Sequence, residues 1–240
     1  MIYRFQTLDS TNNKLKQMAQ NKRAQDGDVV FANTQTAGKG RAGRIWLDAH
    51  GKALLFSILL DAEIHKIVPE NLSLVPIIAA VVVADAIEKK FSISLETKWP
   101  NDLLFRNKKL CGILCESLIE GNSIRAVIIG IGINFDQTKN DFPEKIRERA
   151  TSIKLITDVE YEKEEILMTV VEQLQKLLVS DDGKIYLNLW KKRCPFLGKQ
   201  ISFHAGDVVT SGEFVDLNPK GALILETENG LQTFFSGEIV

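Results

Sequence analysis

The stretch Gly38-Lys39-Gly40-Arg41-Ala42-Gly43-Arg44-Ile45-Trp46 decides between two fold classes for this 240-residue chain. Its first six residues match G-x-G-x-x-G, the pattern that opens a helix directly after a strand in dinucleotide-binding α/β folds. No helical pattern follows here, because Arg44-Ile45-Trp46, another glycine and a strand-like run come next. The sequence therefore argues against a doubly wound parallel sheet, and the absence of Gly-Lys-Ser/Thr excludes a Walker A loop.

The segments on either side of this loop are mostly strand-like. The two short links at 106–108 and 120–122 predict hairpins, which join consecutive strands in antiparallel fashion. We therefore expect a mixed, largely antiparallel sheet with flanking helices, an α+β fold. Strands are expected at residues 29–33, 53–60, 95–98, 103–105, 109–117 and 125–133.

Four helices are predicted. Ser10-Thr11-Asn12-Asn13 caps a short one. Residues 72–90 are apolar nearly all round, which indicates a buried helix. Residues 162–179 are amphipathic and are expected to end at Ser180-Asp-Asp-Gly183, before a short helix that carries Leu187 and Trp190.

The pattern of apolar and polar residues changes near Cys194-Pro195. Short alternating segments separated by turn residues predict about five strands, a unit too small to bury a large core alone. We therefore expect a main domain over residues 1–193 and a small β-barrel over residues 194–240.

Composition excludes several classes of protein. Thirty Lys and Arg face 31 Asp and Glu, which is not the basic balance of a dedicated DNA-binding chain. Three cysteines predict a reducing cytoplasm, and neither a signal peptide nor a membrane span is expected, because the longest apolar run falls well short of the ~20 residues that a span needs. The three histidines are expected at the surface: His50, His65 and His204.

The glycine-rich loop has the chemistry of an anion site. Glycines let backbone N–H groups approach an anion, and Lys39, Arg41 and Arg44 add positive charge that suits phosphate. Because these cations repel one another, we expect a loop that becomes ordered when a ligand binds; a solvated basic turn is the alternative.

Two further motifs place polar residues on apolar strands. Lys98-Trp-Pro-Asn-Asp102 joins two predicted strands, and Lys109 opens the next. Lysine on such a strand points at a charged partner or at solvent. Gly130-Ile-Gly-Ile-Asn134 puts two glycines in a buried strand, a sign of close approach by a ligand or another backbone.

Together these motifs resemble the biotin–protein ligase family. The resemblance rests on Ser10-Thr-Asn12, Gln35, the 38–46 loop, Lys98-Trp-Pro-Asn-Asp102, Lys109-Leu-Cys-Gly112 and Gly130-Ile-Gly-Ile-Asn134, in that order, and on a tail similar to the family's SH3-like barrel. Lys39 departs from the arginine of many members, which puts a bidentate contact there in doubt. The early position of Ser10 implies a stand-alone ligase without the additional DNA-binding domain of some members.

The resemblance implies a class II aminoacyl-tRNA synthetase-like catalytic domain and an ATP-dependent, AMP-forming reaction. Biotin and ATP would give biotinyl-5'-AMP, from which biotin passes to a lysine of the biotin carboxyl carrier domain of acetyl-CoA carboxylase. Mg²⁺ would arrive with ATP, and no dedicated metal site is expected. Neither DNA nor a membrane is an expected partner, and both monomer and homodimer are open.

The resemblance also implies roles for individual residues. The catalytic candidates are Lys109, Arg41, Arg44 and Asp102, with Asp102 equally explained as a turn residue. The ATP-binding candidates are Arg41, Arg44, Lys98, Asn101 and Asn134. The candidates for binding biotin or its adenylate are Ser10, Thr11, Asn12, Gln35, Gly38, Lys39, Gly40, Arg41, Trp46, Lys109 and Gly112.

Three other functions compete with this interpretation. A lipoate–protein ligase would use the same two-step adenylation on a related fold. A biotin-sensing DNA-binding regulator is disfavoured by the charge balance. A nicotinamide oxidoreductase is disfavoured because the glycine motif lacks its helix.

Overall fold

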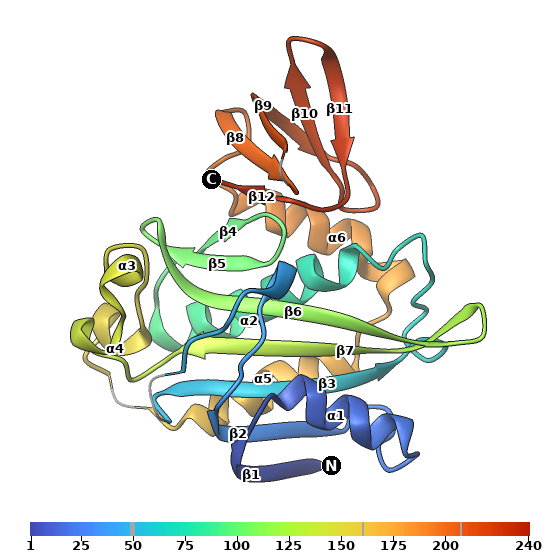
Figure 1. Ribbon diagram of the computed structural model, residues 1–240, viewed down its shortest axis with the longest axis vertical. Coiled ribbons are helices and arrows are strands. Elements are labelled where there is room, and N and C mark those ends of the chain that lie inside the picture. Colours follow the sequence, from blue (N-terminus) through green and yellow to red (C-terminus); the bar gives the residue numbers. More distant parts are fainter. Residues whose placement is uncertain (49–50, 160, 207) are drawn as a thin grey trace.

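A computed structural model gives the fold, and it describes residues 1–48, 51–159, 161–206 and 208–240. A mixed seven-stranded sheet occupies the larger part of the chain (Figure 1). Its strands, β1 to β7, have the order β1-β2-β3-β7-β6-β5-β4. They are β1 (Ile2–Leu8), β2 (Val29–Gln35), β3 (Ala53–Asp61), β4 (Glu96–Lys98), β5 (Asp102–Phe105), β6 (Lys108–Glu120) and β7 (Ser123–Asn134).

Only the β1–β2 pair is parallel, and every other pair in this sheet is antiparallel. The mixed, largely antiparallel sheet that the hairpin turns predicted is therefore confirmed. The register places two rows of residues across its centre. Ser57 of β3 pairs with Gly130 of β7, which pairs with Leu114 of β6, and Gly132 pairs with Gly112.

Helices cover both faces of the sheet. The core on one face combines α2 (Leu74–Phe91), α5 (Lys163–Gln175) and α6 (Val179–Lys192) with alternate residues of β3 and β7. A smaller core forms on the other face, where α1 (Thr11–Gln20) packs on β2, β3 and β7. Because side chains alternate along a strand, Ser57, Gly130 and Gly132 lie on the α1 face. Short helices α3 (Glu144–Arg147) and α4 (Ile153–Ile156) follow β7.

A five-stranded antiparallel sheet forms the C-terminal unit, at one end of the molecule beside β4, β5 and α6 (Figure 1). Trp99 connects it to the large sheet, because its indole Nε1 donates to the Gly221 carbonyl at 3.0 Å and its ring packs on Phe203. Lys191 of α6 and Asp216 add an ion pair at 2.6 Å. The strands are β8 (Gln200–Ala205), β9 (Val208–Leu217), β10 (Leu223–Thr227), β11 (Gly230–Phe234) and β12 (Glu238–Ile239).

Three details differ from the sequence predictions. The helix expected over residues 162–179 ends at Gln175, and Ser180–Gly183 lies inside the first turn of α6 instead of ending a helix. Asp181 and Asp182 explain this, because carboxylates are favourable near a helix N-terminus and Asp182 accepts a hydrogen bond from the Leu178 N–H. The N-terminal strand β1 was not predicted at all.

The third difference is His65, which was expected at the surface and is fully buried. Its two ring nitrogens lie 2.7 Å from the Leu177 carbonyl and 2.9 Å from Asp26 Oδ1, so hydrogen bonds make its burial tolerable. His204 is half-buried in β8, and His50 lies outside the described residues. Within those residues, no helix is both long and apolar enough to cross a membrane.

Candidate active site

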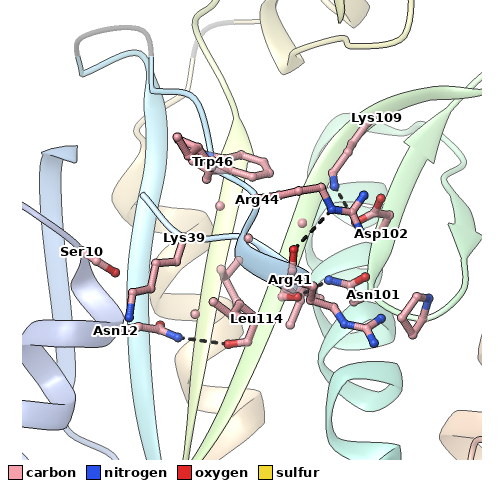
Figure 2. Close-up of a pocket in the computed structure, with 18 of the residues that line it drawn as sticks. Ser10, Asn12, Lys39, Arg41, Arg44, Trp46, Asn101, Asp102, Lys109 and Leu114 are labelled. Atoms are coloured by element: carbon pink, nitrogen blue, oxygen red, sulfur yellow. Dashed lines mark hydrogen bonds and ion pairs between the residues drawn. The ribbon is translucent and has the colours of Figure 1, made fainter. Parts of the chain in front are cut away.

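A pocket opens on the α1 face, between the start of α1, the 38–46 loop, strands β6 and β7, and the C-terminal turn at Gly237–Glu238. Most of the predicted site residues meet there, although they are spread over 100 positions of sequence (Figure 2). Gly38 instead lines the neighbouring cavity, and Asn134 lines neither. The residues brought together are Ser10, Thr11, Asn12, Gln35, Lys39, Gly40, Arg41, Arg44, Trp46, Lys98, Asn101, Asp102, Lys109 and Gly112.

The end of the pocket beside α1, the neutral end, is formed by uncharged side chains. Ser10, Thr11 and Asn12 are each less than 5% exposed. Gln35 Oε1 accepts the Thr11 backbone N–H at 2.8 Å and lies 3.1 Å from Thr11 Oγ1. Ser57 Oγ lies 2.7 Å from Thr11 Oγ1 and 2.6 Å from Asn12 Oδ1. These short contacts fix the side chains before any ligand arrives.

The middle of the pocket is floored by glycines. A Cβ on Gly132 would lie 2.6 Å from the Trp46 ring, and one on Gly112 would lie 2.8 Å from it. A Cβ on Gly130 would lie 2.1 Å from Asn12 Oδ1. The strand glycines therefore admit side chains of this same chain, where the sequence had suggested a ligand or a backbone. Trp46 forms a wall of the pocket.

The opposite end of the pocket is charged. Lys109 Nζ forms an ion pair with Asp102 at 2.7 Å and lies 5.8 Å from the centre of the Trp46 ring. Figure 2 shows Lys109, Asp102 and Arg44 gathered at this end, away from Ser10 and Asn12. Arg44 pairs with Glu238 of the C-terminal unit at 2.5 Å. The repulsion expected among the loop cations is thus partly offset by the Glu238 carboxylate, which lies far from the loop in sequence.

Burial perturbs several of these charges. Desolvation lowers the pKa of Lys98, with Asp102 and Glu238 opposing the shift. Desolvation also lowers the pKa of Arg41, reinforced by the nearby Arg44. Burial acts to raise the pKa of Glu238, but its hydrogen bond to Arg44 and the surrounding cations lower it overall. The pocket therefore holds positive charge that is incompletely compensated, a setting that favours an anion.

The two asparagines predicted to bind ATP, Asn101 and Asn134, are occupied by contacts within the chain. The side-chain amide nitrogen of Asn101 donates to the backbone carbonyl of Ile113. The backbone carbonyl of Asn101 accepts the Ile113 N–H at 3.0 Å, and the two bonds fix the turn against β6. Asn134 donates to the Lys109 carbonyl and accepts from Gln137, both at 3.3 Å. Asn134 thus supports the backbone of Lys109 from behind the pocket wall.

The 38–46 loop is a small hairpin. The Gly40 N–H donates to the Arg44 carbonyl at 2.7 Å, and the Trp46 N–H donates to the Gly38 carbonyl at 2.9 Å. Ala42 and Gly43 both have positive φ at the tip. This backbone holds Arg41 and Arg44 toward the pocket. Among the residues that the structure describes, no group of three or more His, Cys, Asp or Glu side chains is placed to hold a metal ion.

Three polar residues that contact the predicted site residues were not themselves predicted: Ser57, Glu116 and Glu238. Ser57 could have been noticed, because it is the single polar residue in the apolar run from Ala53 to Leu60. Glu116 and Glu238 gave no local signal, since their partners Asn12 and Arg44 lie more than 100 residues away in sequence.

Comparisons with known proteins bear on this geometry. The profile of the biotin/lipoate A/B protein ligase family matches residues 4–134, and that of the biotin protein ligase C-terminal domain matches residues 196–240. The chain is 32% identical to the bifunctional ligase/repressor BirA of Bacillus subtilis, over 100% of this chain and 73% of that protein. It is 29% identical to the biotin–[acetyl-CoA-carboxylase] ligase of Paracoccus denitrificans, over 88% of each.

A solved structure has the same fold. The biotin protein ligase of Aquifex aeolicus, in complex with biotin and ATP, superposes with a TM-score of 0.83 at 31% identity, covering 100% of this chain and 97% of that one.

Proposed function

The chain belongs to the biotin/lipoate A/B protein ligase family, and we propose that it joins biotin to a carrier-protein lysine through biotinyl-5'-AMP. One observation carries the proposal: a single pocket has a neutral end of buried polar side chains and a cationic end, with Trp46 and a glycine floor between them. The neutral end suits the uncharged ring of biotin. The cationic end suits the biotin carboxylate and the ATP phosphates.

The first step makes the adenylate. A biotin carboxylate oxygen attacks the α-phosphorus of ATP, a new carbon–oxygen–phosphorus link forms, and pyrophosphate leaves with the electron pair of the broken bond. The protein supplies no nucleophile, so its contribution is positioning and positive charge. We assign Lys109 to the junction of carboxylate and α-phosphate. Arg41, Arg44 and Lys98 would bind the phosphates, and Asn101 would hold the turn that carries Lys98.

The second step transfers biotin. The amine of the carrier lysine attacks the carbonyl carbon of the mixed anhydride, AMP leaves, and the amine loses a proton. Asp102 is the carboxylate nearest to Lys109. We propose that it orients Lys109, and that it takes the proton of the incoming amine when nucleotide phosphates replace it as the partner of Lys109.

Ser10, Thr11, Asn12 and Gln35 would hold the biotin ring, and Lys39, Gly40 and Trp46 would cover its side chain. Buried polar groups of this kind reject analogues that lack the matching hydrogen-bonding groups. Gly112 leaves space for Trp46 and the Lys109 stem. Asn134 would act indirectly, through the Lys109 backbone.

The proposed partner is the biotin carboxyl carrier domain of a carboxylase, as the name of the Paracoccus denitrificans relative indicates for that protein. Mg²⁺ would enter with ATP and be held by its phosphates, because the nearby carboxylates Asp102 and Glu238 are engaged with Lys109 and Arg44. The cytoplasm is the proposed location, since all three cysteines are free thiols. The domain boundary at residues 193/194 stays a proposal.

The test is incubation with biotin, ATP, Mg²⁺ and an apo carrier domain. We expect the carrier to gain the mass of one biotin, and biotin-dependent exchange of pyrophosphate into ATP. Absence of both products would overturn the proposal.

Lipoate ligation and DNA-linked biotin sensing are tested alongside. Thermal shift should show stabilisation by biotin and not by lipoate; stabilisation by lipoate alone would reassign the substrate. A mobility shift with random duplex DNA at low salt should show no complex.

A further inference from the structure

Two residues outside the predicted site, Ser57 and Glu116, contact the polar side chains of the neutral end. Ser57 is fully buried in the middle of β3, and Glu116 lies on β6 with a quarter of its side chain exposed. Asn12 connects them. Its Nδ2 lies 2.8 Å from Glu116 Oε2 and 3.3 Å from the Leu114 carbonyl, while its Oδ1 lies 2.6 Å from Ser57 Oγ.

The orientation of the Asn12 amide is fixed by Glu116. A carboxylate oxygen and a backbone carbonyl only accept hydrogen bonds, so the amide NH₂ of Asn12 must face both of them. The reverse orientation would place an amide oxygen against two other acceptors. Asn12 Oδ1 therefore faces Ser57, and it can only accept.

Proton counting then sets the rest of the network. Two hydroxyl groups, with one proton each, take part in three oxygen–oxygen contacts: Ser57–Asn12 at 2.6 Å, Ser57–Thr11 at 2.7 Å and Thr11–Gln35 at 3.1 Å. Ser57 must donate to Asn12. The 2.7 Å contact then needs the Thr11 proton, because two hydroxyl oxygens do not approach so closely without one. The longest contact, Thr11 Oγ1 to Gln35 Oε1 at 3.1 Å, is then left without a proton, and Gln35 Oε1 keeps the Thr11 backbone N–H at 2.8 Å as its donor.

From this we infer that Ser57 and Glu116 are positioning residues, which lock Thr11 Oγ1 as a pure hydrogen-bond acceptor toward the pocket. The chain of hydrogen bonds runs from Thr11 through Ser57 and Asn12 to the Glu116 carboxylate. Thr11, with its proton turned away, meets a ring N–H of the ligand and rejects a ring oxygen at the same place. This inference rests on the proposed function, because the ligand with ring N–H groups is biotin.

The experiment measures dissociation constants by calorimetry for biotin and for its cyclic carbamate analogues, in which one ring N–H or the other is replaced by oxygen. In the wild-type protein, the analogue with oxygen opposite Thr11 should bind at least about tenfold more weakly than biotin, since two acceptors then face each other. Ser57→Ala should weaken biotin about tenfold and leave the KM for ATP unchanged.

The decisive readout is the ratio of the two affinities. In Ser57→Ala, Thr11 is free to turn its proton into the pocket, so the penalty for the ring oxygen should fall several-fold. A merely structural loss would weaken biotin and the analogue alike and leave the ratio at its wild-type value. An unchanged ratio, or an unchanged biotin affinity, would overturn the inference.

Glu116 is tested by two substitutions. Glu116→Leu removes the acceptor that orients Asn12, and it should weaken biotin several-fold and reduce the discrimination. Glu116→Gln keeps an acceptor oxygen, so it should lose less of the biotin affinity and of the discrimination. Both remove the 4.0 Å ion pair with Lys16, so that contact cancels in the comparison. Equal losses in the two variants would remove Glu116 from the network.

Ser152→Ala is the matched control, because Ser152 is also fully buried, its hydroxyl bonds the Gln137 carbonyl at 2.6 Å, and neither residue lines the pocket. It should lose stability without changing either affinity. Failure of the proposed function looks different: wild-type protein would then neither bind biotin nor modify a carrier.

Discussion

The two ends of the pocket are built on opposite physical plans. At the neutral end, Thr11, Asn12 and Ser57 are buried, and each is held by contacts of 2.6 to 2.8 Å. At the charged end, the side chains of Lys109 and Arg44 are 39% and 55% exposed. Each forms an ion pair with one carboxylate, Lys109 with Asp102 and Arg44 with Glu238. One end is complete before the ligand arrives, while the other can exchange its partners.

The difference follows from what each end has to recognise. A neutral ring is recognised through hydrogen bonds. When the protein groups are buried and fixed, the direction of these bonds distinguishes a ligand that donates at a given position from one that accepts there. An anion is attracted by charge, and an exposed lysine or arginine side chain can move to keep contact with phosphates as they bind and leave. Substitutions at the neutral end should therefore change affinity for biotin, and substitutions at the charged end should change the chemistry or the binding of nucleotide.

The largest effect is expected at the charged end, from Lys109→Ala. Removal of the cation proposed to bridge carboxylate and α-phosphate should lower biotin-dependent ATP–pyrophosphate exchange by about 10²–10³-fold. Biotin should still bind, with only the contribution of the Lys109 contact to its carboxylate lost, because the neutral end that holds its ring stays intact. Lys108→Ala is the control, since the neighbouring Lys108 carries only a 3.8 Å ion pair with Glu148. Exchange at the wild-type rate in Lys109→Ala would show that the charged end does not act through this lysine.

The next largest effect is expected at the neutral end, from Gly130→Ala. The new methyl group would lie 2.1 Å from Asn12 Oδ1, so Asn12 must move and its contacts with Ser57 and Glu116 must lengthen. Overpacking of this kind costs about 1–3 kcal/mol, and we expect biotin affinity to fall roughly 5- to 150-fold. Calorimetry with ATP alone should show an unchanged dissociation constant. A parallel loss of ATP affinity would mean that the two ends are not independent.

The same contrast explains what sequence could foresee. Strands β2 to β7 and the cluster of cations in the 38–46 loop follow from local patterns, because alternation, hairpin turns and charge are visible within short windows. The grouping of Lys98 and Lys109 with that loop came from the resemblance to a family. Ser57 and Glu116 are 45 and 104 residues from Asn12, so their hydrogen bonds exist only once the fold is formed. The break between α5 and α6 was misplaced because Ser180-Asp-Asp-Gly183 suits a turn and a helix start equally well.

A smaller, pH-dependent effect should separate the two ends. Burial lowers the pKa of Lys98 below its ordinary value of 10.5, so this side chain loses its charge at a lower pH than a solvated lysine does. Phosphates favour the charged form, and ATP should therefore bind more weakly as pH rises through that lowered pKa. We expect a several-fold weakening at pH values below the ordinary lysine pKa of 10.5 that Lys98→Arg reduces, because arginine stays charged there.

The control for Lys98→Arg is Lys89→Arg, at an exposed position near the end of α2. It should reproduce the wild-type dependence of ATP affinity on pH. Biotin affinity, measured over the same range, should vary less with pH than ATP affinity in all three proteins, since hydroxyl and amide groups hold the biotin ring. A biotin affinity that follows the ATP curve would contradict the separation of the two ends.

The smallest effect is expected from Glu238→Gln, which releases Arg44 from the C-terminal unit. The two side chains are 55% and 37% exposed, so their ion pair is screened by solvent and is worth about 0.2–1 kcal/mol. Phosphates then no longer compete with Glu238 for Arg44, and ATP affinity should rise by at most about fivefold at low salt and less at high salt. Arg44 holds the pKa of Glu238 below its ordinary 4.5, so the ion pair persists at every pH above that lowered pKa. The difference in ATP affinity between Glu238→Gln and wild type should vanish only when the pH falls through the lowered pKa. Glu228→Gln, in a turn of the same unit, should leave ATP affinity unchanged at every salt concentration; a Glu238→Gln variant that behaves in the same way would show that Arg44 is held in place by its own loop alone.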